Sequence, residues 1–367
     1  MTKYVVEHIK YLTKSSRYKG IDLLRAVAII GVVFFHLGDP LNINPFQINR
    51  FGWMGVDLFF VLSGFLIGGI IINEIMQRND MDFKLFYKKR FLRIYPLYLF
   101  IIFATIIGNT FVVKATEWNP TQFINQLGSN MLFLQTFIQF NTFYIPGGTW
   151  SLVVEEFFYL FAPILLLLIM KLTNRNLTYT FWILFVIYIS GTVTRLIVIP
   201  DDVNLYFSYM VKPFSRYDEI VAGILVYIIV RKQWFKQYWN KMLYVGLLLC
   251  IAIFIYVRGN HIILLEPHRM TAEVFYYPLI LSFTFGCILL ALYNLKFNNI
   301  IINIVARLSY CIYLIHFVLE TYFKDFRDFN PILLHLLILI SSYAVSLLIE
   351  YPFIRNYRNE STNKPHK

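Results

Sequence analysis

Three ionisable residues lie on one face of the first apolar stretch of the chain. Asp22, Arg25 and His36 interrupt a segment that is otherwise almost entirely apolar. A helix of 3.6 residues per turn places Arg25 and His36 nearly in line, roughly 16 Å apart along its axis. An imidazole can accept and return a proton near neutral pH, so His36 is a candidate general base. Alternatively, Asp22 and Arg25 reach the aqueous interface while His36 caps the other end of the helix.

Two adjacent glutamates, Glu155 and Glu156, begin another apolar run. Neighbouring residues on a helix point about 100° apart, so one of the two at most can line a cavity well. Glu155 shares its face with Ser151 and Tyr159, and Trp150 begins the run. Acidic groups inside a membrane segment are costly, which makes this pair a candidate for function.

Arg90 and Arg93 lie three positions apart and therefore share a helical face. Paired guanidinium groups match the oxygens of a phosphate, so these residues, together with Lys89, are candidates for binding a phosphate-bearing donor from the cytosol. Basic residues also flank membrane spans on the cytoplasmic side for reasons of orientation alone. The pattern alone leaves both interpretations open.

Other polar residues occupy apolar runs and are weaker candidates. Ser309, Tyr313 and His316 share one face of the run 300–322. The step Ser63-Gly64 is more typical of close helix packing than of catalysis. The remaining candidates are Asp57, Trp150, Arg216 and Asp218.

The elements that must position these residues are membrane helices. Hydrophobic residues make up 58% of the 367 residues and charged residues only 15%, against about 25% charged residues in soluble domains. Ten apolar runs are long enough to span a bilayer. They lie at about 21–37, 52–73, 94–113, 150–170, 179–199, 213–230, 242–257, 274–294, 300–322 and 331–352. The sequence therefore predicts an all-α polytopic bundle of about ten transmembrane helices, with the membrane lipids as its surroundings.

The basic residues indicate how this bundle is oriented. The run 121–140 is too polar for a confident span, and if it does not cross, most clusters of Lys and Arg fall on one side. We therefore expect both termini in the cytoplasm, with a segment 1–20, a membrane domain 21–354 and a tail 355–367. The first run lacks a small-residue cleavage site, so we expect a retained anchor in the cell membrane.

The charge distribution and the cysteine spacing argue against a nucleic-acid-binding protein and against a metal site. The formal net charge of +12 comes from short clusters between apolar runs, so nucleic acid is not an expected partner. Cys250, Cys287 and Cys311 lie inside apolar runs without metal-binding spacing, and no metal site is expected.

In their order along the chain, these segments resemble the membrane-bound acyltransferase-3 family over about residues 18–355. The resemblance rests on Gly20 to Arg25 with His36, Phe59 to Phe65, Arg90 with Arg93, Trp150-Ser151-Leu152 with Glu155, Arg216 with Asp218 and Gly223, Ser309-Tyr310 to His316, and Glu350-Tyr351-Pro352. Val153-Val154 departs from a more polar pair that often precedes the acid. No esterase-like domain follows, so we expect any partner for a final transfer step, such as a glycan-synthesis protein, to be a separate chain.

The resemblance implies an O-acyltransferase that moves an acyl group, usually acetyl, from cytosolic acyl-CoA to a glycan or lipid-linked sugar at the outer face. By the same resemblance His36 is the catalytic base, Arg25 supports it, the developing oxyanion or the donor, Arg90 and Arg93 engage the CoA phosphates, and Glu155 is an essential acid. A proton-coupled transporter or flippase of glycan precursors is the alternative, in which the same ionisable residues form a proton relay. A bundle that only scaffolds a glycan-synthesis complex is a third.

Overall fold

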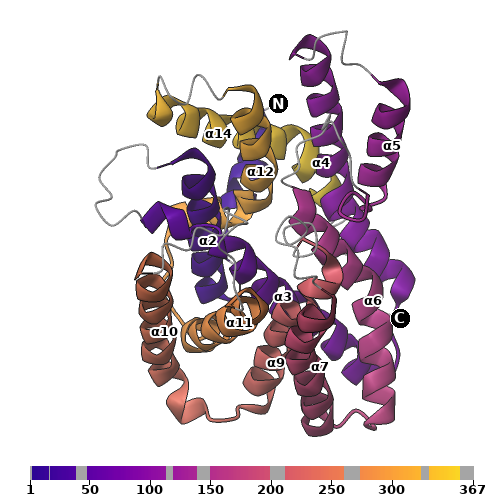
Figure 1. Cartoon of the computed structure of the whole chain (residues 1–367), viewed down its shortest axis with the longest axis vertical. Coiled ribbons are helices and arrows are strands. Elements are labelled where there is room, and N and C mark those ends of the chain that lie inside the picture. The colour runs from indigo at the N-terminus through magenta and orange to yellow at the C-terminus, as the bar shows by residue number, and fades with distance from the viewer. Residues whose placement is uncertain are drawn as a thin grey trace.

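The computed structural model describes residues 2–15, 17–38, 48–112, 119–138, 149–198, 211–259, 273–323 and 330–355. Within these ranges every regular element is helical and no strand occurs, which confirms the predicted all-α fold. Ten helices match the ten predicted runs, and Figure 1 shows how they are arranged. They are α2 (Lys19–Leu37), α3 (Met54–Arg78), α4 (Phe83–Val112), α6 (Trp150–Leu172), α7 (Leu177–Val198), α9 (Tyr217–Lys232), α10 (Trp239–Gly259), α11 (Glu273–Leu292), α12 (Ile300–Tyr322) and α14 (Pro331–Val345).

Nine stretches of the described chain are long and apolar enough to cross a membrane. Helix α9, with 16 residues, is the predicted span that falls short of that length. The last stretch joins α14 to a π-helical turn, Ser346–Glu350, and continues to Arg355. The predicted tail after residue 355 lies outside the described residues.

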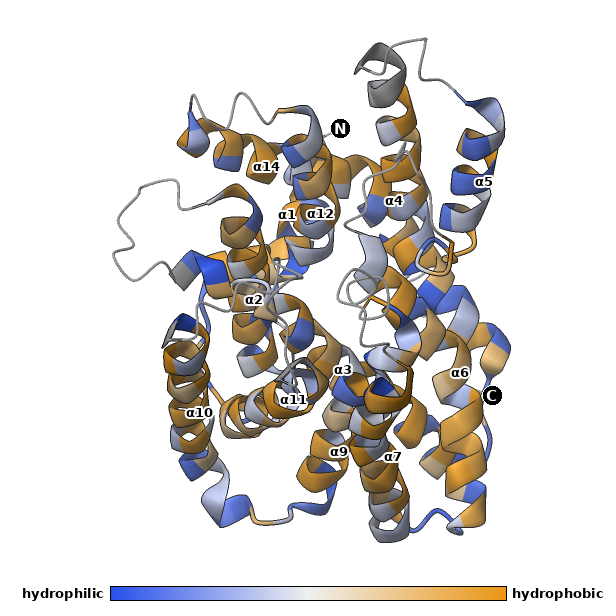
Figure 2. Cartoon of the chain, in the orientation of Figure 1, coloured by the Kyte–Doolittle hydropathy of each residue, from blue (hydrophilic) through white to orange (hydrophobic). Residues whose placement is uncertain are grey.

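Two shorter helices flank the bundle. Helix α5 (Pro120–Met131) begins at Asn119, whose side chain accepts a hydrogen bond from the backbone N–H of Gln122 at 3.0 Å. Twelve residues extend only about 18 Å, so α5 cannot by itself cross a hydrocarbon core of about 30 Å. Figure 2 shows more polar residues on α5 than on the long helices. Helix α1 (Thr2–Thr13), which the sequence reading did not predict, packs against α12.

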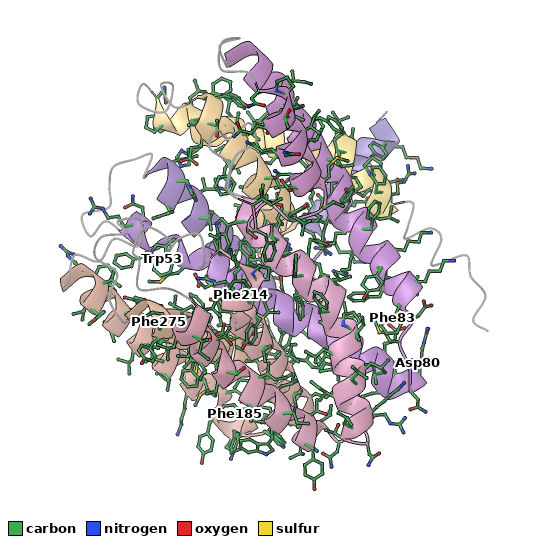
Figure 3. The ribbon with its side chains drawn as sticks, turned by 45° about the vertical axis from the view of Figure 1, so that its right-hand side comes forward. Trp53, Asp80, Phe83, Phe185, Phe214 and Phe275 are labelled. Carbon is green, nitrogen blue, oxygen red and sulfur yellow. The ribbon has the colours of Figure 1, made fainter. Side chains whose placement is uncertain are left out.

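Helix α3 is the central element. It contacts α2, α6, α9 and α11, and 72% of its most apolar window is buried. Trp53 at its start and Asp80 just after its end lie on opposite sides of the molecule (Figure 3). Because α3 is buried on most sides, its few polar side chains must face other helices or a cavity.

Glycines allow α3 and α9 to approach closely. A Cβ atom on Gly64 would lie 1.8 Å from the backbone oxygen of Ile220, and one on Gly223 would lie 2.0 Å from that of Val61. No side chain fits at such distances, so both positions require glycine. The packing role of the Ser63-Gly64 step therefore belongs to Gly64.

Helices α2 and α12 run parallel and in register. Arg25 of α2 pairs with Ser309 of α12, and His36 pairs with Glu320. Each helix advances eleven residues between the two pairs, and both advance in the same direction. The register fixes Arg25 and His36 at opposite ends of one interface.

Candidate functional site

A cavity of about 260 Å³ lies between α2, α3, α4, α6 and α12. Much of its wall is apolar, including Phe59, Leu66 and Ile70 of α3. Its charged groups are Arg25, Arg90, Arg93 and Glu155, and serine and tyrosine hydroxyls make up the rest of its polar wall. Five helices, with lining residues from Arg25 to Tyr313, thus meet around one space.

Glu155 is held firmly in this wall. The Ser63 hydroxyl donates to its Oε1 at 3.1 Å, and the Tyr159 hydroxyl donates to its Oε2 at 2.9 Å. Ser151, Glu155 and Tyr159 all line the cavity, whereas Glu156 is absent from its wall. The helical periodicity predicted this arrangement. Each carboxylate oxygen has a further lone pair with which to accept a hydrogen bond from a ligand.

The three arginines of the cavity have different surroundings. Arg25 donates to the Ser309 hydroxyl at 2.9 Å. The Arg90 guanidinium lies 5.8 Å from the ring centroids of both Phe86 and Tyr159, and its Nε has no hydrogen-bond partner among the described residues although it is buried. Arg93 is exposed along the cavity edge. Three guanidinium groups face one carboxylate, so the cavity favours an anion.

His36 lies at the far end of the same interface. Its Nδ1 is 3.3 Å from Oε2 of Glu320, and each side chain is less than 30% exposed. A carboxylate at this distance favours the tautomer with its N–H at Nδ1, and in that tautomer Nε2 carries the lone pair that can accept a proton. Sequence reasoning missed Glu320. The signal was present, because Glu320 follows Ser309 by the same eleven positions that separate Arg25 and His36.

His36 is not part of the described cavity wall, but a chain of rings connects the two. The Tyr313 hydroxyl, in the wall, lies 2.6 Å from the Ser151 hydroxyl. The rings of Tyr313 and His316 are 5.5 Å apart, and those of His316 and His36 are 5.2 Å apart. Arg25 and His36 are roughly 16 Å apart along α2. A single carbonyl oxygen therefore cannot touch both.

The other predicted residues lie outside the cavity wall. Asp22 is buried on α2, and Lys89 is half-buried on α4. Asp57, Trp150, Arg216 and Asp218 gather in a separate cluster between α3, α6, α7 and α9, together with Arg195 and Glu219, which the sequence analysis did not select. His316 is fully buried beside His36.

Comparison with known proteins assigns this architecture to a family. The model of a family described as an acyltransferase domain matches residues 18–351. The chain is 31% identical over 201 residues to O-acetyltransferase OatA of Staphylococcus aureus, a match that covers 53% of this chain and 32% of the relative. It is 31% identical over 172 residues to peptidoglycan O-acetyltransferase OatA of Listeria monocytogenes, covering 44% of this chain and 26% of the relative.

A third relative matches over almost its whole length. A candidate acetyltransferase, ORF330 of Acidianus two-tailed virus, is 28% identical over 354 residues, or 95% of this chain and 94% of the relative. The matches to the bacterial relatives span about a third or less of those proteins. No solved structure matches the chain. Since the family model covers nearly the entire chain, the protein belongs to the acyltransferase-3 family.

Proposed function

We propose that this protein is a membrane O-acetyltransferase that takes an acetyl group from cytosolic acetyl-CoA and delivers it to a hydroxyl of a glycan or lipid-linked sugar at the outer face of the cell membrane. The family and the O-acetyltransferase names of its relatives support the reaction. The observation that carries the donor assignment is the cavity with three guanidinium groups against one carboxylate. CoA presents several phosphates, and arginine forks bind phosphate oxygens in pairs.

The cavity also suits the rest of this donor. Phosphates at Arg90 and Arg93 would lie at the cytoplasmic end of α4, while the apolar wall from Ile70 to Phe59 would enclose the pantetheine arm. Glu155 can accept hydrogen bonds from the amide N–H groups of that arm, since its oxygens keep lone pairs. Arg25, held by Ser309, would lie along the same path.

In the proposed reaction His36 is the general base. The acceptor hydroxyl transfers its proton to Nε2 of His36 as its oxygen bonds to the acetyl carbonyl carbon. The carbon–sulfur bond then breaks, and the departing CoA thiolate takes the proton from His36. Glu320 positions the ring through Nδ1 and stabilises its positive charge while the proton is held.

The proposed orientation places both termini in the cytoplasm. Basic residues cluster in the segments that such an orientation puts inside, including the link between α3 and α4. The arginines of the cavity then face the compartment that holds acetyl-CoA, and His36 faces the opposite side.

Labelled donor tests this proposal directly. Inside-out membrane vesicles from cells expressing the chain would receive acetyl-labelled acetyl-CoA, and alkali-labile label in the lumenal glycan fraction would be counted. We expect label in ester form, and none in vesicles lacking the protein. Folded protein that transfers no label, or that moves unmodified glycan precursor across the vesicle membrane, would contradict the proposal and favour a carrier.

A further inference from the structure

A buried cluster of five charged side chains lies beside the cavity, at the end of α3 where Trp53 and Phe214 also lie (Figure 3). Arg216, just before α9, donates from Nη2 to Oδ1 of Asp57 at 2.6 Å, and its Nε lies 3.1 Å from Oε1 of Glu219. Asp57 is 1% exposed and Glu219 is fully buried. Arg195 and Asp218 complete the cluster, so two cations face three carboxyl groups.

Arg195 and Asp218 form a complete ion pair within the cluster. Arg195 binds both carboxylate oxygens of Asp218, at 2.9 and 2.8 Å. Its other N–H groups bond to Phe275 O, Ser215 O and the Thr192 hydroxyl, so all five of its donors are used. Asp218 is therefore the partner of Arg195, and among the residues that the structure describes Arg216 remains as the cation for both Asp57 and Glu219.

The two remaining carboxyl groups lie against one guanidinium. Nη2 of Arg216 is 2.6 Å from Oδ1 of Asp57 and 3.5 Å from Oε2 of Glu219. Oδ2 of Asp57 is buried without a hydrogen-bond donor among the described residues. Two buried carboxylates beside one cation leave an uncompensated negative charge, which is costly in the protein interior. A proton on one of the two groups removes that charge.

We propose that Asp57 and Glu219 bind one proton between them at neutral pH, and that this acid pair is the counter-charge that holds Arg216 in place. The charged and titratable groups facing the acid pair are Arg216, Asp218, and Arg195 and Tyr188 of α7. None of them supplies a second positive charge to the pair, since Arg195 is committed to Asp218.

The acid pair acts on the site through Arg216. The Arg216 guanidinium lies 5.7 Å from the ring of Phe60, which lines the cavity, and 5.5 Å from the ring of Trp150. Trp150 is the first residue of α6, the helix that carries Ser151 and Glu155 into the cavity wall. Asp57, Glu219 and Arg216 are thus positioning residues, and the proton site stands whatever substrate the cavity takes.

Infrared spectroscopy detects the proton directly. The carbonyl stretch of a protonated carboxylic acid would be recorded for the purified full chain at pH 7, as difference spectra against Asp57→Asn and Glu219→Gln. An amide replaces the acid without changing its shape, and the carboxylate left behind keeps Arg216 paired. We expect each variant to lose one and the same protonated-acid band, which shifts in D₂O. Glu7→Gln, at the exposed ion pair with Arg355, serves as the control and should keep the band.

Other results overturn the proposal. A band that persists in one folded variant and is lost in the other would show that a single carboxyl group holds the proton instead of the pair. No difference band in either variant would show that the acid pair binds no proton. Folding is checked by circular dichroism and gel filtration. The double variant Asp57→Asn with Glu219→Gln leaves Arg216 without a counter-charge, so we expect a large loss of folded protein that neither single variant shows.

Discussion

The cavity and the cluster between α3, α7 and α9 both contain arginines, but the arginines of the two regions differ in how many of their N–H donors have protein partners. In the cluster, Arg195 is fully buried and uses all five N–H donors on protein partners. In the cavity, Arg90 stacks on two rings and its Nε has no partner among the described residues. The two regions share Phe60 as a common boundary.

We propose that this difference separates charges that stabilise the bundle from charges that bind a ligand. Burying an ion pair is costly unless its hydrogen bonds are complete, which is the condition that Arg195 meets. A guanidinium beside a cavity can complete its hydrogen bonds with water or with a ligand that enters the cavity. Substitutions in the cluster should therefore change stability, and substitutions in the cavity should change donor binding.

The largest effect is expected from Asp218→Asn. It leaves the buried Arg195 without its carboxylate, and breaking a buried pair on one side costs about 3–5 kcal/mol. We expect a strong loss of folded protein in detergent, measured as the thermal midpoint and the monodisperse yield. Glu7→Gln breaks a partly exposed pair and should cost about 1 kcal/mol or less. Equal losses in the two variants would refute the distinction.

A smaller and different effect is expected from Arg90→Gln. Losing a charge-assisted hydrogen bond to phosphate costs about 1.5–3 kcal/mol, so the KM for acetyl-CoA should rise tenfold or more while the thermal midpoint changes little. The effect should vanish with acetyl-pantetheine, which has no phosphate. Arg78→Gln, at an exposed pair with Glu74, is the matched control. A KM that rises equally for both donors would place the phosphates elsewhere.

The smallest effect concerns His8 of α1, which is neither in the cavity nor in the cluster. Burial lowers the pKa of His8 to about 4, and its Nε2 contacts the Ser346 hydroxyl at 3.2 Å. Protonation therefore favours the undocked helix, and docking should weaken as the pH falls from about 6.5 towards 4. Between pH 7 and 5.5 we expect about eightfold more opening of α1 by hydrogen exchange, after correction for intrinsic rates. His8→Gln should remove this dependence, and an unchanged dependence in that variant would assign it to another group.

Sequence periodicity predicted the helices and part of the site, because both depend on local spacing. The ten helices follow from the length of the apolar runs. The helical repeat predicts that Ser151, Glu155 and Tyr159 share a face and that at most one of Glu155 and Glu156 lines a cavity. Helix α1 was missed because its polar and basic composition hides an amphipathic pattern.

Partners across helices could not be predicted from a single sequence. Glu320 near His36 depends on the register between α2 and α12, which are far apart in the chain, and Arg195 on Asp218 depends on how α7 packs against α9. A Cβ atom on Gly191 of α7 would lie 2.5 Å from Cγ of Asp218, a close approach that depends on tertiary packing. The same packing places the candidates Arg216 and Asp218 in the cluster and not in the cavity wall.

The central claim is that His36 accepts the proton in acyl transfer. His36→Ala in the inside-out vesicles, with labelled acetyl-CoA, tests it most directly. General base catalysis contributes about 10² to 10⁴ in rate, so we expect transfer of label to fall by at least a hundredfold while the thermal midpoint and donor binding stay near those of the unmodified protein. Transfer at the normal rate by folded His36→Ala protein would contradict the account.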